Sequence, residues 1–192
     1  MLESAIGSRQ ARGRSGSAAA VNVTIEAAFL RCERRLGSFL AQMVGDRALA
    51  EDLLQDTFYD ACRTARTMAA GEIENADAWL FGIARNRALN ALRRRRRFTA
   101  AFDRLRQRPC ESVTEDSELV ALRDLVERNL NPDDRALLIL RYVHEFNASE
   151  LASMTGQTSD AIRQRLSRAR ARIIEAAAEE VGPGTTREES DR

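Results

Sequence analysis

Apolar residues recur at steps of three and four along most of this 192-residue chain, and this spacing restricts the possible folds more than any other feature. Side chains at these steps share one face of an α-helix, so each such stretch predicts an amphipathic helix. Aromatic residues make up only 5% of the chain. The cores are therefore expected to consist mainly of Leu, Ala, Ile and Val carried on helices, and the sequence predicts an all-α fold.

The helical stretches are separated by recognisable breaks. Gly45-Asp46 ends the first stretch, Asp77 is the expected N-cap of the third, and Asn131-Pro132-Asp133 is typical of a helix start. Thr155-Gly156-Gln157 predicts a tight turn before the last helix. The expected helices span residues 24–43, 48–67, 78–97, 118–130, 134–144, 147–154 and 158–178.

These helices fall into two groups, which predicts two small helical domains. The first three can close a bundle, because helices of this length joined by short connections pack together. Residues 99–116 lose the apolar pattern and contain Pro109, which predicts a flexible linker. We expect a disordered basic arm over 1–22, a three- or four-helix bundle over 23–98, the linker over 99–116, a helix-turn-helix domain over 117–180 and a disordered tail over 181–192.

The charges are distributed more informatively than the net charge of +1 suggests. Seven Arg and no acid lie between Arg85 and Arg97, and five Arg and no acid lie between Arg163 and Arg172. Acids gather instead on the stretch 51–60. Two basic blocks and a separate acidic face indicate two kinds of partner, of which one is a polyanion.

The composition argues against several classes of site. The 30 basic residues include no Lys, which excludes a phosphate-binding loop with its lysine and Schiff-base chemistry. Cys32, Cys62 and Cys110 are odd in number, far apart and have no nearby His, so we expect neither zinc nor a disulfide framework. The one His, His144, has no nucleophile or metal partner at a readable spacing. We expect no metal, no cofactor and no enzyme activity.

The chain also has no sequence signal for a membrane. No apolar run approaches the length that spans a bilayer, and the N-terminus has no signal-peptide core. We therefore expect a cytoplasmic protein without a membrane partner and without a small-molecule substrate.

The last predicted helix has the pattern of the DNA-reading helix of a helix-turn-helix. Ile162 and Leu166 are four residues apart and are expected to face inward. Such a helix presents its N-terminal half to the major groove, where Arg can grip G and Gln can grip A. Hydroxyls and free N–H groups at its start suit phosphate. The side chains expected at DNA are Thr158, Ser159, Arg163, Gln164, Ser167 and Arg168.

Two earlier helices carry features that indicate partners, although each also has a plainer interpretation. Trp79, Asn86 and the arginine run over 93–97 suit an unstacked base and a phosphate backbone, but Trp79 fits a core position equally well. The acids between Glu51 and Asp60 would repel DNA and suit docking to a basic protein surface. An ordinary solvated helix face would show the same acidic pattern.

Three segments together resemble the extracytoplasmic-function sigma factors of bacterial RNA polymerase. Ala50-Glu51-Asp52-Leu53-Leu54-Gln55-Asp56-Thr57-Phe58 resembles the segment of that family that binds the largest polymerase subunit. Trp79-Leu80-Phe81-Gly82-Ile83-Ala84-Arg85-Asn86 resembles the segment that melts and reads the −10 promoter element. Leu166-Ser167-Arg168-Ala169-Arg170-Ala171-Arg172 resembles the end of the helix that reads the −35 element.

The resemblance implies a role for each set of residues, and partners in core polymerase, promoter DNA and an anti-sigma protein. Core polymerase would be held by Asp52, Gln55, Asp56 and Tyr59. The −10 element would be contacted by Trp79, Arg85, Asn86, Asn90 and Arg93. The −35 element would be contacted by the six residues expected at DNA on the last helix. The loop over 66–77 would receive a flipped base.

Some positions differ from the family pattern, and two other functions remain open on the sequence. Ser159-Asp160-Ala161-Ile162 stands where the family usually has Gly-Thr-Val, which leaves the promoter sequence undefined. A stand-alone regulator would use only the C-terminal helix-turn-helix and a palindromic site, but it would give the two N-terminal motifs no purpose. An enzyme is the more distant alternative.

Overall fold

The computed structural model describes residues 25–68, 73–102 and 117–181, and within these ranges the secondary structure is seven helices without a strand. This confirms the predicted all-α fold. The expected arm over 1–22, most of the expected linker and nearly all of the expected tail lie outside the described residues. The helices are a first helix over 25–44, α2 Arg47–Ala65, α3 Ala76–Phe102, α4 Ser117–Asn129, α5 Pro132–Tyr142, α6 Ala148–Thr155 and α7 Ser159–Val181.

The helix ends follow local capping chemistry, and one predicted cap is wrong. Asn75, not Asp77, caps α3, because its Oδ1 accepts from the Ala78 N–H at 2.9 Å. Asp77 lies in the first turn of α3 and pairs with Arg31 at 2.6 Å. The predicted start of α5 is confirmed, since the Asn131 side chain caps it and Pro132 stands in its first turn.

Helix α3 continues to Phe102, five residues past its predicted end at Arg97. The extra turn contains two alanines, which favour helix, and no Gly or Pro. Arg95 also ties this part of α3 to the end of the first helix by donating to the Val44 carbonyl at 3.4 Å. The first residues of the expected linker are therefore helical.

The first helix, α2 and α3 form one bundle with an aliphatic and aromatic core. Phe39, Leu40 and Phe81 are fully buried, and the Phe39 and Phe81 ring centroids are 5.9 Å apart. Cys32 is buried as well, and burial raises the pKa of its thiol to about 11. This cysteine acts as a small core residue, as the sequence predicted.

Helices α4 to α7 form the second bundle, in which α6 and α7 are the predicted helix-turn-helix. Asn147 and Glu150 form a capping box at the start of α6. Gly156 ends α6 in the left-handed conformation at φ 67°, which glycine adopts without the steric cost that a Cβ brings. The chain then turns sharply into α7.

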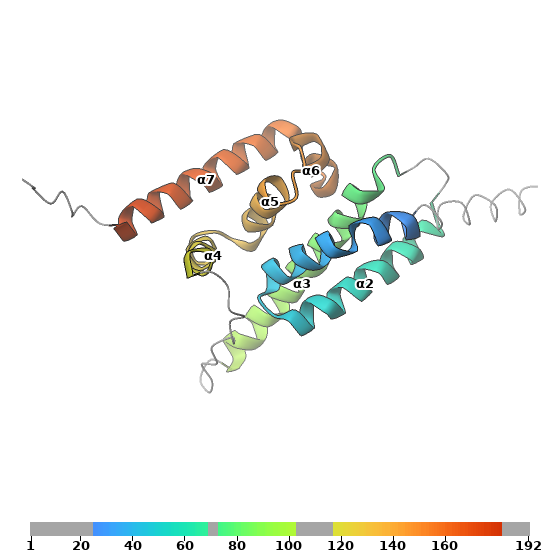
Figure 1. Cartoon of the computed structure of the whole chain (residues 1–192), viewed down its shortest axis with the longest axis horizontal. Coiled ribbons are helices and arrows are strands. Elements are labelled where there is room, and N and C mark those ends of the chain that lie inside the picture. The colour runs from blue at the N-terminus through green and yellow to red at the C-terminus, as the bar shows by residue number, and fades with distance from the viewer. Residues whose placement is uncertain (1–24, 69–72, 103–116, 182–192) are drawn as a thin grey trace, which may run out of the picture.

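The two bundles pack directly against each other. Helices α5 and α6 contact α3 on one side and α7 on the other, as Figure 1 shows. Most of the buried apolar residues of the two bundles form a single continuous cluster that runs from Ile25 to Leu166. We call this arrangement the closed form. It was not predicted from the sequence.

Candidate nucleic-acid interface

The exposed face of α7 carries the side chains that were predicted to meet DNA. Arg163, Gln164, Ser167 and Arg168 are exposed, whereas Ile162 and Leu166 are buried. Arg168 Nη2 donates to Gln164 Oε1 at 3.2 Å, so two of these side chains are already oriented toward each other. A helix with this face outward can enter a major groove while its other face stays in the core.

The start of α7 combines a cap with an acidic neighbour. The Thr158 hydroxyl accepts from the Ala161 N–H at 3.2 Å and keeps its own proton for a further acceptor. Ser159 is half-buried, and Asp160 is exposed. Asp160 forms an ion pair with Arg163 one turn later, which offsets the repulsion that its carboxylate would exert on a phosphate.

A second row of predicted DNA-binding residues follows one side of α3. Asn86, Asn90 and Arg93 are exposed, and the half-buried Trp79 lies two turns before Asn86. Arg93 Nη1 donates to Asn90 Oδ1 at 3.1 Å. The row offers a ring for stacking, two amides for hydrogen bonds and a cation, which suits single-stranded nucleic acid.

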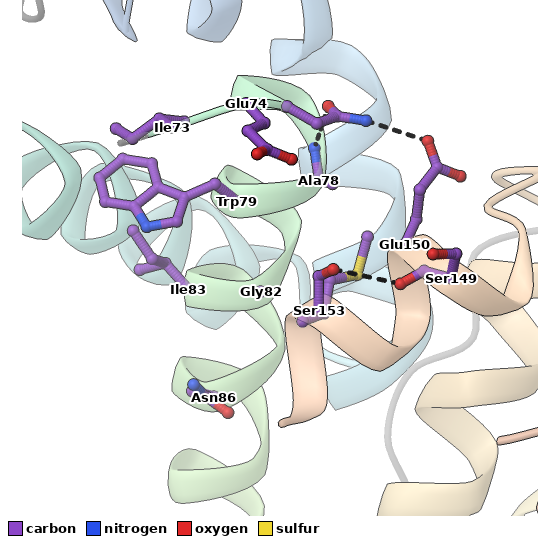
Figure 2. A pocket seen from close by; sticks show the side chains of 12 residues that line it. Ile73, Glu74, Ala78, Trp79, Gly82, Ile83, Asn86, Ser149, Glu150 and Ser153 are labelled. Atoms are coloured by element: carbon purple, nitrogen blue, oxygen red, sulfur yellow. Dashed lines mark hydrogen bonds between the residues drawn. The ribbon is translucent and has the colours of Figure 1, made fainter. Parts of the chain in front are cut away.

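A groove of about 530 Å³ lies between this row and α6. The groove is lined by Trp79 and Asn86 of α3 and by Ser149, Glu150 and Ser153 of α6, and Figure 2 shows the two helices side by side. Its rim is tied by a hydrogen bond from Asn75 Nδ2 to Glu150 Oε1 at 2.9 Å. In the closed form, the α6 carboxylate therefore stands beside the row that was predicted to bind DNA.

Arg85 differs from the other predicted −10 residues because it is only 6% exposed. Its Nη2 donates to Asp133 Oδ1 on α5 at 2.6 Å. Burial lowers the pKa of this guanidinium, and the Asp133 charge acts in the opposite direction. Its buried Nε has no hydrogen-bond partner among the described residues. In the closed form, Arg85 is held between the bundles and is not presented to DNA.

The residues predicted to bind polymerase share one exposed face of α2. Asp52, Gln55, Asp56 and Tyr59 are all exposed, and the Tyr59 side chain is the most prominent apolar group there, at 68%. Asp56 is not free, because its Oδ2 accepts from Arg87 Nη1 of α3 at 3.0 Å. The face thus presents an aromatic ring within a negative surface.

Two features of the junction were missed at the sequence level. The sequence indicates Asp133 only as part of a helix start, yet Asp133 and the adjacent Asp134 each bind an arginine of another helix. Gly82 was not singled out, although a Cβ there would lie 3.7 Å from three Met154 atoms of α6. The two adjacent acids at the start of α5 were the available signal, but their spacing says nothing about which helix they meet.

The described residues hold no group of three or more His, Cys, Asp or Glu side chains that could bind a metal ion. Cys32 and Cys62 are free thiols. His144 is buried, with its ring against those of Phe39 and Phe81. Within the same ranges, no helix is both long and apolar enough to cross a bilayer.

Comparison with known proteins finds similarity over both bundles. Family models for Sigma-70 region 2 and for Sigma-70, region 4 match residues 28–98 and 120–173. The RNA polymerase sigma factor CarQ of Myxococcus xanthus is 34% identical over 143 residues, which are 73% of this chain and 81% of CarQ. The ECF RNA polymerase sigma factor BldN of Streptomyces coelicolor is 31% identical over 65% of this chain. The matched part is about half (49%) of the length of BldN.

A solved structure extends this similarity to three dimensions. The sigma factor RpoE, in a co-crystal structure with the anti-sigma factor NepR from Bartonella quintana, matches with a TM-score of 0.62 and 27% sequence identity. The match covers 79% of this chain and 95% of RpoE, so it includes helices of both bundles.

Proposed function

Because this chain belongs to the extracytoplasmic-function sigma factors of RNA polymerase, we propose that three exposed helix faces divide its contacts among core polymerase and two promoter elements. A sigma factor directs promoter-specific transcription initiation, and this chain binds core polymerase and promoter DNA in that role. The observation that carries the division is that the three motifs lie on three different helices, α2, α3 and α7, with most of their polar side chains exposed.

The first face is that of α2, which we assign to core polymerase. Asp52, Gln55, Asp56 and Tyr59 recur at steps of three and four, so one basic and apolar partner surface can contact all four. Repulsion from phosphates makes the same face unsuitable for DNA. Tyr59 supplies the large amphipathic side chain that is frequent at the energetic centre of protein interfaces.

The test of this face is the variant Asp52→Arg in a binding measurement with core polymerase. We expect the affinity to fall at least tenfold, about 1.4 kcal/mol, because a cation would replace an anion opposite a basic surface. Asp56→Arg is a poorer choice, since it would place a second cation beside Arg87 and disturb the packing of α2 on α3.

Asp124→Arg is the matched control for Asp52→Arg. It makes the same charge change at an exposed position on α4, outside the three proposed faces. Equal losses in the two variants would show that net charge, and not this face, sets the affinity. An unchanged affinity of Asp52→Arg would contradict the assignment.

The second face is the row along α3, which we assign to the −10 element. Extruding a base from a duplex costs a few kcal/mol, and stacking on an aromatic ring returns roughly 1–3 kcal/mol per base. Trp79 is the ring available for stacking, Asn86 and Asn90 are the hydrogen-bonding side chains, and Arg93 is the phosphate contact. Arg85 joins this set only when the two bundles separate.

The third face is the N-terminal half of α7, which we assign to the −35 element. Arg163, Gln164, Ser167 and Arg168 would face base edges, and the free N–H groups at Thr158 and Ser159 would meet phosphate. The exposed, ion-paired Asp160 orients Arg163, so it acts within the protein and not directly on DNA.

The remaining assignments concern the domains and the kind of activity. We assign the −10 and core-binding domain to 23–98, the linker to 99–116 and the −35 domain to 117–180, with an arm over 1–22 and a tail over 181–192. Sigma factors are generally non-catalytic regulators of RNA polymerase. We extend this to the chain, which would work in the cytoplasm by binding alone and without a cofactor.

An anti-sigma protein is the further partner that we propose. The support is the similarity over both bundles to RpoE, whose solved structure is a complex with the anti-sigma factor NepR. Such a partner would compete with core polymerase for the free chain. Affinity capture with the purified chain, followed by elution with core polymerase, tests this, and retention of the captured protein in the presence of excess core would contradict it.

A further inference from the structure

Two adjacent carboxylates at the start of α5 each hold an arginine of a proposed DNA-binding helix. Asp133 accepts from Arg85 of α3 at 2.6 Å and lies 3.8 Å from Arg93 of the same helix. Asp134 accepts from both Nε and Nη2 of Arg165 of α7, at 2.9 and 2.6 Å. Of these contacts, the ones made by Asp133 join the two bundles.

Asp133 is bound by arginines of α3 in the way that a phosphate would be bound. Guanidinium groups bind carboxylates and phosphates through the same pair of N–H donors, so a carboxylate can take the place of a phosphate. Two arginines, Arg85 and Arg93, converge on one carboxylate oxygen pair. The fork of Arg85 is incomplete, because its buried Nε has no partner among the described residues while Nη2 binds Asp133. A phosphate could use the donor that the carboxylate leaves unsatisfied.

We propose that Asp133 is an internal substitute for a DNA phosphate, which holds the free chain in the closed form and keeps Arg85 from DNA. This inference rests on the proposed role of α3 at the −10 element. Binding to polymerase and promoter exchanges the carboxylate for a phosphate on the same guanidinium. The free chain is therefore autoinhibited by its own second domain.

The distance between the two promoter elements requires the closed form to open when the chain binds a promoter. Elements at −35 and −10 are about 25 base pairs apart, or roughly 85 Å of duplex at about 3.4 Å per base pair. In the closed form α6 contacts both α3 and α7, and neighbouring helix axes lie about 10 Å apart, so the two DNA-binding helices are only about 20 Å apart. The fourteen residues between α3 and α4 are enough chain, at roughly 48 Å of full extension, for the two bundles to leave contact.

Other contacts between the two bundles also stabilise the closed form. Arg35 donates to the His144 carbonyl at 2.7 Å, and Arg135 donates to the Met43 carbonyl. Phe81 of α3 packs against Phe146 with ring centroids 4.9 Å apart. Loss of Asp133 alone should therefore shift the population toward the open form without abolishing the closed one.

Gly82 offers a stronger and independent way to open the junction. It is buried on α3 against α6, with Met154 atoms 3.7 Å from the place of a Cβ. Gly82→Ala should fit, because 3.7 Å is ordinary van der Waals contact. Gly82→Leu places further carbons where the Met154 backbone already lies, and leucine favours helix more than glycine does, so α3 should stay folded while α6 is displaced.

The experiment measures the full chain without polymerase in two ways. Small-angle X-ray scattering reports the radius of gyration, and fluorescence anisotropy reports affinity for a forked duplex with a single-stranded overhang. The variants are Asp133→Asn and Gly82→Leu. Their controls are Asp124→Asn, which removes an equal charge from an exposed site of the second domain, and Gly82→Ala. Circular dichroism checks that helix content is retained.

We expect Gly82→Leu to enlarge the radius of gyration and to raise DNA affinity at least fivefold. Asp133→Asn should also enlarge the radius, and its DNA affinity should be at least twofold higher than that of Asp124→Asn. Equal affinities of Asp133→Asn and Asp124→Asn would overturn the phosphate-substitute role. An unchanged radius in both test variants would overturn the closed form as a restraint. Run-off transcription with saturating core polymerase tests the proposed function separately, since failure of the wild-type chain there would overturn that function whatever the scattering shows.

Discussion

The buried side chain of His144, which lies between the two domains, makes the stability of the fold depend on pH. It is 5% exposed and its ring contacts Phe39 and Phe81 of the first bundle, although the residue itself follows α5 of the second. Burial, with a smaller contribution from the nearby Arg35 charge, lowers the pKa of this imidazole from 6.5 to about 4. The ring is therefore neutral in the closed fold at neutral pH.

The stability of the fold should decrease as the pH falls below 6.5. Between pH 6.5 and 4, the unfolded chain binds a proton at His144 and the folded chain does not, so acid favours unfolding. From pH 7 to 5.5, this contribution is about 1 kcal/mol. Urea unfolding at the two pH values measures it. His144→Gln should lose about 1 kcal/mol less over that interval, and equal losses in both proteins would contradict the role of the imidazole.

Arg168 tests the assignment of α7 at the scale of a single base contact. An arginine that binds a guanine edge contributes about 1–3 kcal/mol of discrimination, whereas a phosphate contact weakens binding to all sequences alike. We expect Arg168→Ala in the holoenzyme to reduce the preference for the −35 element by about that amount. Arg172→Ala, at an exposed position one turn later, should lower affinity without changing the preference. Uniform weakening by Arg168→Ala would assign it to phosphate.

At the scale of the helix, the sequence predicted most elements, because caps and breaks are local. The Asn131-Pro132 start and the Gly156 turn need only neighbouring atoms, and both predictions are confirmed. The errors arose where two local solutions compete. Asn75 and Asp77 are both good capping residues, and the choice of Asn75 accompanies a tertiary pair between Asp77 and Arg31.

The capping box of α6 should contribute measurably to stability. The Asn147 side chain accepts from the N–H groups of Ser149 and Glu150, and Glu150 returns a bond to the Asn147 N–H. We expect Asn147→Ala to lower the free energy of unfolding by about 1 kcal/mol, measured by urea denaturation. Asn147→Asp, which keeps an acceptor at the cap, should recover most of the loss. A loss below a few tenths of a kcal/mol would contradict the contribution of the cap.

At the scale of the whole molecule, the packing of the two domains could not be predicted from the sequence. The contacts that join them are distant in the chain, such as Arg35 with His144, 109 residues apart. Periodicity shows that a residue such as Phe81 is buried but not what covers it. The outward site residues on α2, α3 and α7 were predictable because exposure needs only the helical period. Arg85 was predicted for DNA on the motif alone, and its burial depends on the partner domain.

The shared core predicts that the chain unfolds as one unit. Trp79 is the only tryptophan and lies in the first domain beside α6, so its fluorescence reports that domain, while circular dichroism reports helices of both. We expect the two signals to give coincident urea transitions in the wild-type chain. Gly82→Leu should separate them by uncoupling the domains. Two separate transitions in the wild-type chain would contradict a stable closed form.

The central claim is most directly tested by run-off transcription with purified chain and sigma-free core polymerase on a pool of upstream DNA fragments. We expect initiation at a defined subset of fragments, its loss in Asp52→Arg and its retention in Asp124→Arg. No initiation by a folded wild-type chain that still retains DNA in a mobility-shift assay would contradict the account, and so would full activity of Asp52→Arg.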